Sequence, residues 1–324
     1  MNRRRFLASA MATLPTLSLA GGCFAQDSYP IRPVKLISTD PPGTGVDIAT
    51  RVYADRLSAL LKQQFVVENK AGGVGLVAAK AAVGAPADGY TLLAAAASTF
   101  TIMPARRENS DLDLNRSLIP IGLLGQLPQI IAISPKTGIN SLKELIDAAR
   151  KEPERLLCGT NGAGTFPHLT AKRFVDVAQA PITIVPYASG GTNEVARDIL
   201  GGRVQMVVTG LSAILGLVQS GDLKLLATAT EKRLAKYPDV PTVSETIPGF
   251  TAVGWSVLAA PAGTPDGVVQ LIHRTMNGIA GEAAVRSKLE DMGTFPLSMS
   301  LKETRAFIEM EQRTWHPIAK AVGG

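Results

Sequence analysis

A loop rich in proline and glycine, residues 38–47 with the sequence STDPPGTGVD, stands directly before an amphipathic helical pattern. The first N–H groups of a helix have no intrahelical partner and lie at the positive end of the helix dipole, so such a loop can bind an anion. Gly43 and Gly45 would let the backbone approach a ligand, whereas Pro41 and Pro42 restrict the loop. A tight turn without a ligand is the structural alternative.

The same order of strand, glycine-bearing loop and helix occurs twice more, in residues 155–178 and 182–202. In open α/β sheets, ligands bind beyond the carboxyl ends of the strands, where such loops gather. The occurrence of three such loops favours a ligand-binding role over tight turns that bind no ligand. They suit a carboxylate or a similar anion.

Signals for catalysis are weak. The sequence has no HExxH pair, no GxSxG elbow and no Walker loop. His168, His273 and His316 are far apart in the chain, and the last two lie in helical patterns. Cys158 lies in an apolar strand pattern, where we expect a buried, inert thiol. An enzyme is therefore the less favoured class, with no metal site expected.

One pattern remains open to a cofactor interpretation. Gly73, Gly75 and Ala78 match the GxGxxA pattern of dinucleotide-binding loops. The strand pattern before them, residues 65–68, is short, and an exported protein would have little access to a nicotinamide cofactor. We therefore predict no cofactor.

Composition excludes other classes of protein. The 324 residues are 46% hydrophobic and 19% charged, which allows a full core and about two domains. The formal charge of +6 is small, and without the basic N-terminal stretch it falls further. Aromatic residues make up only 5% of the chain. Clustered basic residues with stacking aromatics, as nucleic-acid binding requires, are missing.

Residues 1–25 are typical of an export signal, with a basic start, an apolar stretch and small residues before Ala25. The run Arg3 to Arg5 resembles a twin-arginine signal, and the general secretory route is the alternative. The sequence AGGC ending at Cys23 is a weak lipoprotein box, so a lipid anchor is the less favoured alternative. Cleavage after Ala25 leaves Cys158 as the one cysteine and rules out an intrachain disulfide.

From residue 33 onward, short apolar runs alternate with helical periodicity, which predicts an α/β fold with a mostly parallel sheet. The long apolar segment 118–134 is expected to cross from one lobe to another. Ser141 with Glu144, and Ser300 with Glu303, are predicted to cap helices. Strands are expected at 33–38, 65–68, 90–96, 204–209 and 223–229.

Six ordered segments together resemble the Bug family, the periplasmic solute receptors of tripartite tricarboxylate transporters. They are PPGTGVD, VVENKAGGVG, ADGYTLL, NGAGTFPHL, VPYASGGTNEVARDILGGRV, and PDVPTV followed by APAGTP. The resemblance implies an α/β, two-lobed periplasmic-binding-protein (Venus flytrap) fold, each lobe an open, mostly parallel sheet flanked by helices. Lobe 1 would comprise residues 26–125 and 249–324, and lobe 2 residues 126–248. A carboxylated solute would be held between the lobes, largely by backbone N–H groups and ordered waters.

The resemblance also implies which residues bind the ligand. Asp47 is expected to accept hydrogen bonds from loop N–H groups, a water or a ligand hydroxyl, or simply to cap its helix. Thr165 would donate to the ligand or cap its helix, and a structural role for His168 is equally open. The residues carried over are Pro42, Gly43, Thr44, Gly45, Val46, Asp47, Ser98, Thr99, Asn161, Gly162, Ala163, Gly164, Thr165, His168, Tyr187 and Ser189.

Several positions depart from the family pattern. Thr44 stands where the family commonly has glycine, Thr209 where it often has aspartate, and Phe100 and Phe166 where small polar residues are common. All four are counted as candidate ligand-binding residues. If Phe100 and Phe166 face the cleft, an aromatic or partly apolar carboxylate is expected.

The function expected from these observations is a periplasmic receptor that delivers a small carboxylate to the membrane subunits of a tripartite tricarboxylate transporter. Signalling through a membrane sensor kinase is the alternative, because both roles would use the same closure around the solute. A periplasmic enzyme is less favoured. We expect a monomer that binds no nucleic acid.

Overall fold

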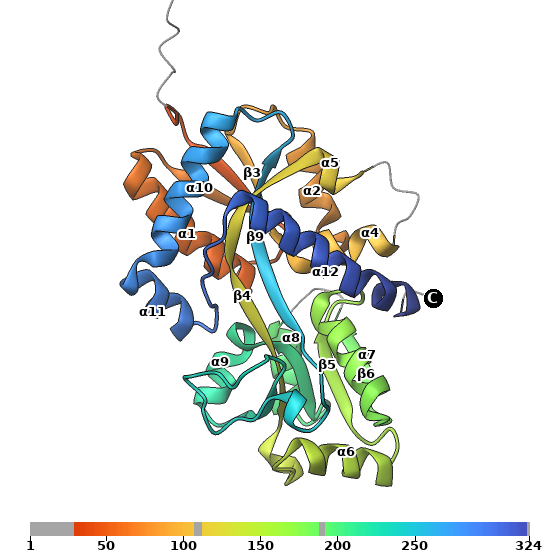
Figure 1. Cartoon of the computed structure of the whole chain (residues 1–324). Helices are drawn as coiled ribbons and strands as arrows, with labels where there is room; N and C mark the ends of the chain where they lie inside the picture. Colours follow the sequence, from red (N-terminus) through yellow and green to blue (C-terminus); the bar gives the residue numbers. More distant parts are fainter. Residues whose placement is uncertain (1–28, 107–111, 188–191, 323–324) are drawn as a thin grey trace, which may run out of the picture.

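Two long strands, β4 (Leu118–Ile133) and β9 (Val253–Pro261), join two α/β lobes (Figure 1). The computed structural model describes residues 29–106, 112–187 and 192–322. The predicted export signal, residues 1–25, and the candidate site residue Ser189 lie outside these ranges.

The other strands are short. They are β1 (Val34–Ser38), β2 (Phe65–Asn69), β3 (Thr91–Ala96), β5 (Leu157–Asn161), β6 (Thr183–Tyr187), β7 (Met206–Gly210) and β8 (Lys224–Thr228). The helices are α1 (Gly45–Leu61), α2 (Leu76–Val83), α3 (Ala97–Thr101), α4 (Met103–Arg106), α5 (Leu114–Ser117), α6 (Leu142–Lys151), α7 (Phe166–Ala178), α8 (Thr192–Leu200), α9 (Leu211–Gln219), α10 (Asp266–Gly281), α11 (Ala283–Asp291) and α12 (Leu301–Val322).

Strand β4 belongs to the sheets of both lobes. From Leu118 to Pro128 it pairs antiparallel with β9, and from Gln129 to Ile133 it pairs with β7 and β8. The register with β9 shifts near Gly122 and Gly125, where the strand is irregular. This pairing confirms the prediction that the apolar segment crosses between lobes.

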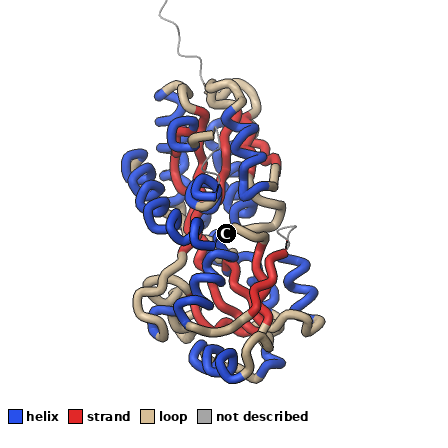
Figure 2. Tube along the Cα trace, turned by 90° about the vertical axis from the view of Figure 1, so that its right-hand side faces the viewer, coloured by secondary structure: helices blue, strands red, loops and turns tan. Residues whose placement is uncertain are grey.

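Outside the crossing strands the sheets are parallel, as predicted. In one lobe β1 pairs in parallel with β2 and β3, and in the other β5 pairs in parallel with β6 and β7. Strands β4 and β9 add the antiparallel pairs, so that the complete sheet is mixed, in the order β2-β1-β3-β9-β4-β7-β5-β6 with β8 beside β4. Helices flank the strands of each lobe (Figure 2).

Local signals explain where helices begin. Ser141 Oγ accepts a hydrogen bond from the Glu144 N–H at 3.1 Å and so caps α6. Ser300 and Glu303 bond to each other's backbone N–H groups at the start of α12. Both predicted caps are confirmed. Because Tyr53 and Leu57 are four residues apart on α1, they share one face of the helix and are buried in the core of lobe 1.

Helix α12 connects the two lobes through aromatic contacts. It begins beside the crossing strands and ends near α7 (Figure 1). The rings of Trp315 in α12 and Phe166 in α7 lie 4.3 Å apart, centroid to centroid. Phe307 of the same helix packs on Trp255 of β9 at 5.5 Å. The helix thus contacts both a crossing strand and the first turn of α7.

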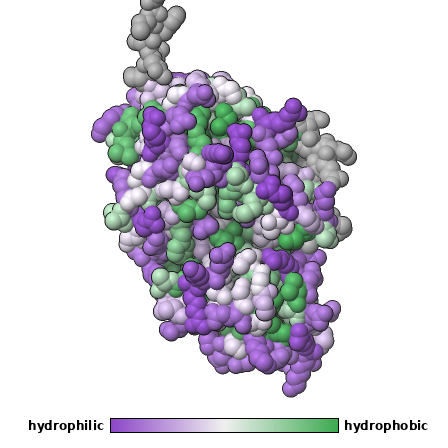
Figure 3. All heavy atoms as spheres, in the orientation of Figure 1, coloured by the Kyte–Doolittle hydropathy of each residue, from purple (hydrophilic) through white to green (hydrophobic). Residues whose placement is uncertain are grey.

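Among the described residues, no helix is long and apolar enough to cross a bilayer. On the face in Figure 3, hydrophobic residues are scattered among hydrophilic ones.

Helix α7 is held by a buried aromatic pair, Phe174 against Phe250, with ring centroids 6.4 Å apart. Replacing Phe174 by alanine should lower the free energy of unfolding by about 3–5 kcal/mol, because the side chain is fully buried. Val177→Ala is the matched control on the same helix. Its side chain is 53% exposed, so the change should stay within about 0.5 kcal/mol. Urea unfolding measures both, and equal losses would contradict this account of α7.

Candidate functional site

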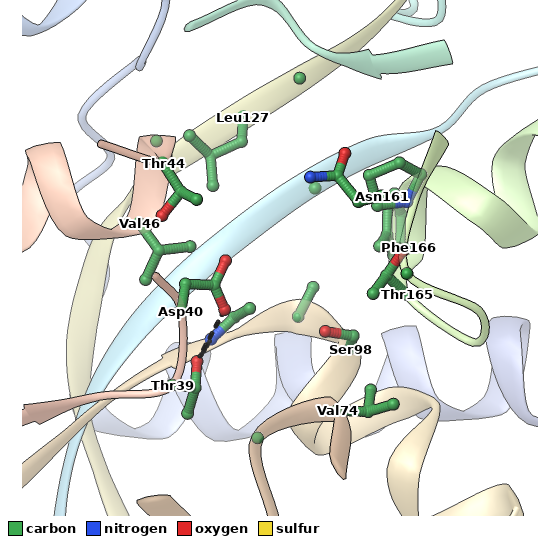
Figure 4. A pocket seen from close by; sticks show the side chains of 18 of the residues that line it. Thr39, Asp40, Thr44, Val46, Val74, Ser98, Leu127, Asn161, Thr165 and Phe166 are labelled. Carbon is green, nitrogen blue, oxygen red and sulfur yellow. Dashed lines mark hydrogen bonds between the residues drawn. The ribbon is translucent and has the colours of Figure 1, made fainter. Parts of the chain in front are cut away.

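A cavity of about 580 Å³ lies between the two lobes (Figure 4). Its volume is typical of pockets for small molecules. Lobe 1 contributes Thr39, Asp40, Pro41, Thr44, Gly45, Val46, Ala71, Gly72, Gly73, Val74, Gly75, Ala96, Ala97 and Ser98 to its wall. The remaining lining residues are Leu127, Gln129, Asn161, Gly162, Ala163, Thr165, Phe166, Pro167, Thr209, Gly210, Ser212, Ala213, Gly254 and Trp255. Both crossing strands therefore contribute to the wall.

Four helices of eight or more residues begin at this cavity. The N-cap residues of α1, α2, α7 and α9 are Thr44, Gly75, Thr165 and Gly210, and each of them lines the wall. The N–H groups of a first helical turn lack intrahelical partners, and each helix dipole adds a partial positive charge of about half a unit at that end. The wall therefore favours a negatively charged group without using a basic side chain.

Asp47 braces the first of these loops from behind. Its Oδ2 accepts hydrogen bonds from the Gly43 N–H and from Arg51 Nε, both at 3.0 Å. Its Oδ1 accepts from Asn69 Nδ2 at 2.8 Å. Burial alone would raise the pKa of Asp47, but these hydrogen bonds and the Arg51 charge outweigh it and hold the pKa below its usual value. Asp47 therefore shapes the loop and does not line the cavity.

Asp40 carries a carboxyl on the cavity wall at the end of β1. Thr39 Oγ1 donates a hydrogen bond to its Oδ1 at 3.1 Å. Burial, together with the nearby Asp47 carboxylate, raises the pKa of Asp40 to about 6, although the Thr39 hydrogen bond acts against this. At neutral pH the group is mostly ionised. It would repel a second carboxylate 4 Å away by about 4 kcal/mol at an effective dielectric constant of about 20.

The wall of lobe 2 presents uncharged polar groups. Thr165 Oγ1 is buried, has no hydrogen-bond partner among the described residues, and makes no side-chain cap for α7. Asn161 lies beside it in Figure 4, and its Oδ1 accepts a hydrogen bond from Thr209 Oγ1 at 2.9 Å. Gln129 of β4 donates to the Leu127 carbonyl at 3.1 Å, while its Oε1 has no partner in the described part of the chain. These groups can hydrogen-bond a solute.

Two glycines of the wall are required by close packing. A Cβ on Gly45 would lie 2.4 Å from Ser212 Oγ and 2.6 Å from Leu127 Cδ2. A Cβ on Gly75, whose φ is +87°, would lie 2.1 Å from Thr99 Oγ1. Close packing and backbone conformation thus account for Gly75 without a dinucleotide. The first contact brings the start of α1 against α9 of the other lobe.

The structure brings many of the predicted site residues together. Those that line the cavity are Thr44, Gly45, Val46, Ser98, Asn161, Gly162, Ala163, Thr165, Phe166 and Thr209. Those that lie outside its wall are Pro42, Gly43, Asp47, Thr99, Phe100, Gly164, His168 and Tyr187.

Phe100 and Thr99 face the interior of lobe 1. Phe100 is fully buried, and its ring packs near Trp255 with centroids 6.3 Å apart. Thr99 is also buried and packs on Gly75. Phe166 does line the cavity, while its ring packs on Trp315. The expectation of an aromatic solute required both phenylalanines in the cleft, and the structure places only Phe166 on its wall.

The remaining outliers support the loops. The Gly164 N–H donates to His168 Nδ1 at 3.3 Å, so this histidine stabilises the second loop. The Tyr187 hydroxyl points to Asp198 and bonds its Oδ2 at 2.5 Å. The family resemblance implies that these positions lie in the ligand-binding loops, but it does not tell which way each side chain faces.

Sequence reasoning missed several wall residues. Asp40 stands before two prolines and is typical of a turn residue, and Gln129 and Trp255 reach the wall only because the crossing strands pair there. The glycine-rich turn 72–75, which leads into α2, was recognisable in the sequence by its GxGxxA pattern. That pattern was weighed as a dinucleotide-binding loop and not as part of the solute site.

Groups suited to other chemistry lie elsewhere. Cys158 is buried in β5, and burial raises the pKa of its thiol to about 12. This confirms the prediction of an inert thiol. The described residues contain no cluster of three or more His, Cys, Asp or Glu side chains that could hold a metal ion.

Asp40 and Asp47 should affect stability in opposite directions. The folded-state pKa of Asp40 is raised from 3.8 to about 6, so ionisation weakens the fold as pH rises through this range. Asp40→Asn should therefore raise the melting temperature at about pH 8 and raise it less at about pH 5. The pKa of Asp47 is lowered, so its contribution is present above the unfolded value of 3.8 and is lost as pH falls through the folded value. Asp47→Asn should be destabilising to a similar extent at both pH values.

Thermal unfolding of the two variants and the unaltered protein at both pH values checks this prediction. A gain for Asp40→Asn that is equally large at both pH values would contradict the raised pKa. An unchanged melting temperature for Asp47→Asn would contradict the bracing role.

Comparisons with known proteins agree with this architecture. A sequence model described as the tripartite tricarboxylate transporter family receptor matches residues 49–323. Protein BugT of Bordetella pertussis is 31% identical over 329 aligned positions, which cover 100% of this chain and 99% of BugT.

Solved structures are also similar. Rpa4515 of R. palustris, solved with adipate, is 29% identical with a TM-score of 0.86, covering 91% of this chain and 98% of that one. The periplasmic binding protein BugD is 26% identical with a TM-score of 0.82, covering 91% and 99%. The two-lobed fold is therefore that of periplasmic binding proteins. The chain belongs to the tripartite tricarboxylate transporter receptor family, in agreement with its resemblance to Bug proteins.

Proposed function

We propose that this protein is a periplasmic receptor that captures a small carboxylate between its lobes and delivers it to the membrane subunits of a tripartite tricarboxylate-type transporter. The observation that carries this proposal is the convergence of four helix N-termini on one cavity. Backbone N–H groups that are free at helix starts can bind a carboxylate. At α2 the first N–H groups, of Leu76 and Val77, bond the carbonyls of Gly73 and Gly72, so α2 contributes mainly its dipole. The similar protein Rpa4515 was solved with a dicarboxylate, adipate.

Capture would involve movement of the lobes about the crossing strands. In the proposed division, residues 26–125 and 249–324 move as lobe 1 and residues 126–248 as lobe 2. A solute bound by N–H groups of both lobes has higher affinity for the closed state and shifts the population toward it. Gly45 of lobe 1 lies close to Ser212 of lobe 2, and this contact between the lobes supports the proposed closure. Closure would also exclude water and strengthen the electrostatic interactions inside.

The wall offers little for catalysis. Asp40 is the single ionisable residue on the described wall, and the hydroxyl that it bonds, that of Thr39, is held in the strand framework by the Ala96 N–H. The family and the structural neighbours are binding proteins. An alternative role as a ligand sensor for a membrane kinase would use the same cavity, and the proposed export to the periplasm serves both roles.

Solute binding is tested by thermal unfolding of protein stripped of ligand by denaturation and refolding. Adipate, succinate, citrate and benzoate form the panel, with glucose and NAD as controls. A carboxylate at about 100 times its dissociation constant should add about 2.7 kcal/mol and raise the melting temperature by several degrees. A response to glucose or NAD alone, or to nothing, would overturn the proposal.

The role of lobe closure is tested by Gly45→Ala. The added Cβ would collide with Ser212 and Leu127, so the affinity for the best carboxylate of that panel should fall about tenfold or more. Ser212→Ala removes the nearer atom and should restore part of the affinity in the double variant. Gly216→Ala is the matched control, because a Cβ there meets nothing within 4 Å. Calorimetric titration measures the solute affinity of the unaltered protein, Gly45→Ala, the double variant and Gly216→Ala. Full affinity in Gly45→Ala would contradict the closed contact.

A further inference from the structure

The position of Asp40 is fixed by its surroundings. Its carbonyl accepts a hydrogen bond from Asn69 Nδ2 at 2.9 Å, and its carboxyl Oδ1 accepts from Thr39 Oγ1 at 3.1 Å. The hydroxyl of Thr39 in turn accepts from the Ala96 N–H at 3.0 Å. These contacts tie Asp40 to β2 directly and to β3 through Thr39. Figure 4 shows the carboxyl reaching into the cavity between the side chains of Thr44 and Ser98.

The carboxyl of Asp40 has no counter-ion in the described part of the chain. No lysine, arginine or histidine lines the cavity wall there. Arg51, on the neighbouring helix, is bonded to Asp47 and Asn69. Asp40 Oδ2 makes no hydrogen bond with the residues that the structure describes.

Other acids of this protein have such partners. Asp47 is paired with Arg51, and Asp198 with Arg203. Asp40 is partly buried in the wall, and an ionised carboxylate that loses part of its hydration is stabilised by a partner that is charged or donates hydrogen bonds. On the wall of a binding cavity, that partner can come from the solute.

We propose that Asp40 determines specificity by accepting hydrogen bonds from a protonated amine of the solute, so that the receptor takes carboxylates that carry an amino group. This inference rests on the proposed function. The carboxylate of the solute lies against the helix N-termini, and its ammonium group lies against Asp40. The cavity wall thus offers a carboxylate and helix N-termini to the two opposite charges of such a molecule.

One alternative would give Asp40 the opposite role. Its pKa of about 6 leaves a protonated fraction near neutrality, and a protonated carboxyl can donate to a solute carboxylate. The two roles are separated by Asp40→Asn. Asparagine keeps the acceptor for Thr39 and can itself donate to a carboxylate, but it has no charge to attract an ammonium group. A donor role therefore survives the substitution, whereas an amine-binding role does not.

The experiment compares matched solutes by calorimetric titration at about pH 8, where Asp40 is ionised and the amines are protonated. The pairs are adipate with 2-aminoadipate, and hexanoate with 6-aminohexanoate, in buffer treated with a chelator so that no divalent cation bridges two carboxylates. We expect the better amino compound to bind the unaltered protein about tenfold or more tightly than its partner. Asp40→Asn should abolish that preference, while the affinity for the plain carboxylates stays the same or rises.

Asp147→Asn is the matched control, because it removes one negative charge from the exposed helix α6, far from the cavity. It should leave the preference unchanged. Plain carboxylates that bind as well as their amino partners, or a preference that survives Asp40→Asn, would overturn the inference and leave the proposed function standing. Failure of all four solutes and of the wider carboxylate panel to bind would overturn the proposed function itself.

Discussion

The unpaired N–H groups at helix N-termini are the constraint on which the rest of this structure depends. Four helix N-termini meet at one cavity, two from each lobe. This requires the loops between strands and helices in both lobes to lie at the edge of the sheet that faces the cavity. Parallel strands achieve this within a lobe, because their carboxyl ends share an edge. Between the lobes, the alignment depends on β4 and β9, which pair along most of the length of β9.

A binding site built from the backbone needs support from side chains that never touch the solute. Asn69 provides this in lobe 1, since its amide bonds both the Asp40 carbonyl and the Asp47 carboxylate. In lobe 2, His168 holds the Gly164 N–H. Glycines complete the arrangement where a side chain would collide, as at Gly45 and Gly75. The polar residues behind the wall therefore fix the shape of the loops that line it.

The sequence predicted the positions of strands and helices well, but it predicted poorly which side chains point into the cavity. The predicted strands 33–38 and 90–96 are β1 and β3 to within one residue, because short apolar runs ended by turn residues are a local signal. The family resemblance placed Phe100, Tyr187 and His168 in the site, but contacts with Trp255, Asp198 and Gly164 turn them away from the cavity. Gln129 and Trp255 join the wall through the pairing of β4 with β9, which no local pattern reveals.

Asp40 and Asp47 show how a fold separates structural from functional charges. They lie seven positions apart around one loop, yet Asp47 has an arginine, an amide and a backbone N–H as partners, whereas Asp40 has one threonine hydroxyl. The partners of Asp47 offset the cost of its burial and lower its pKa, while burial of Asp40 is not offset and its pKa is raised. The fold does not compensate the free energy that burial of the Asp40 carboxylate costs. Because this carboxylate lies on the wall of a cavity, a solute that supplies the missing partner stabilises it. In this receptor, the backbone then attracts the anionic end of the solute, and a single side chain selects the other end.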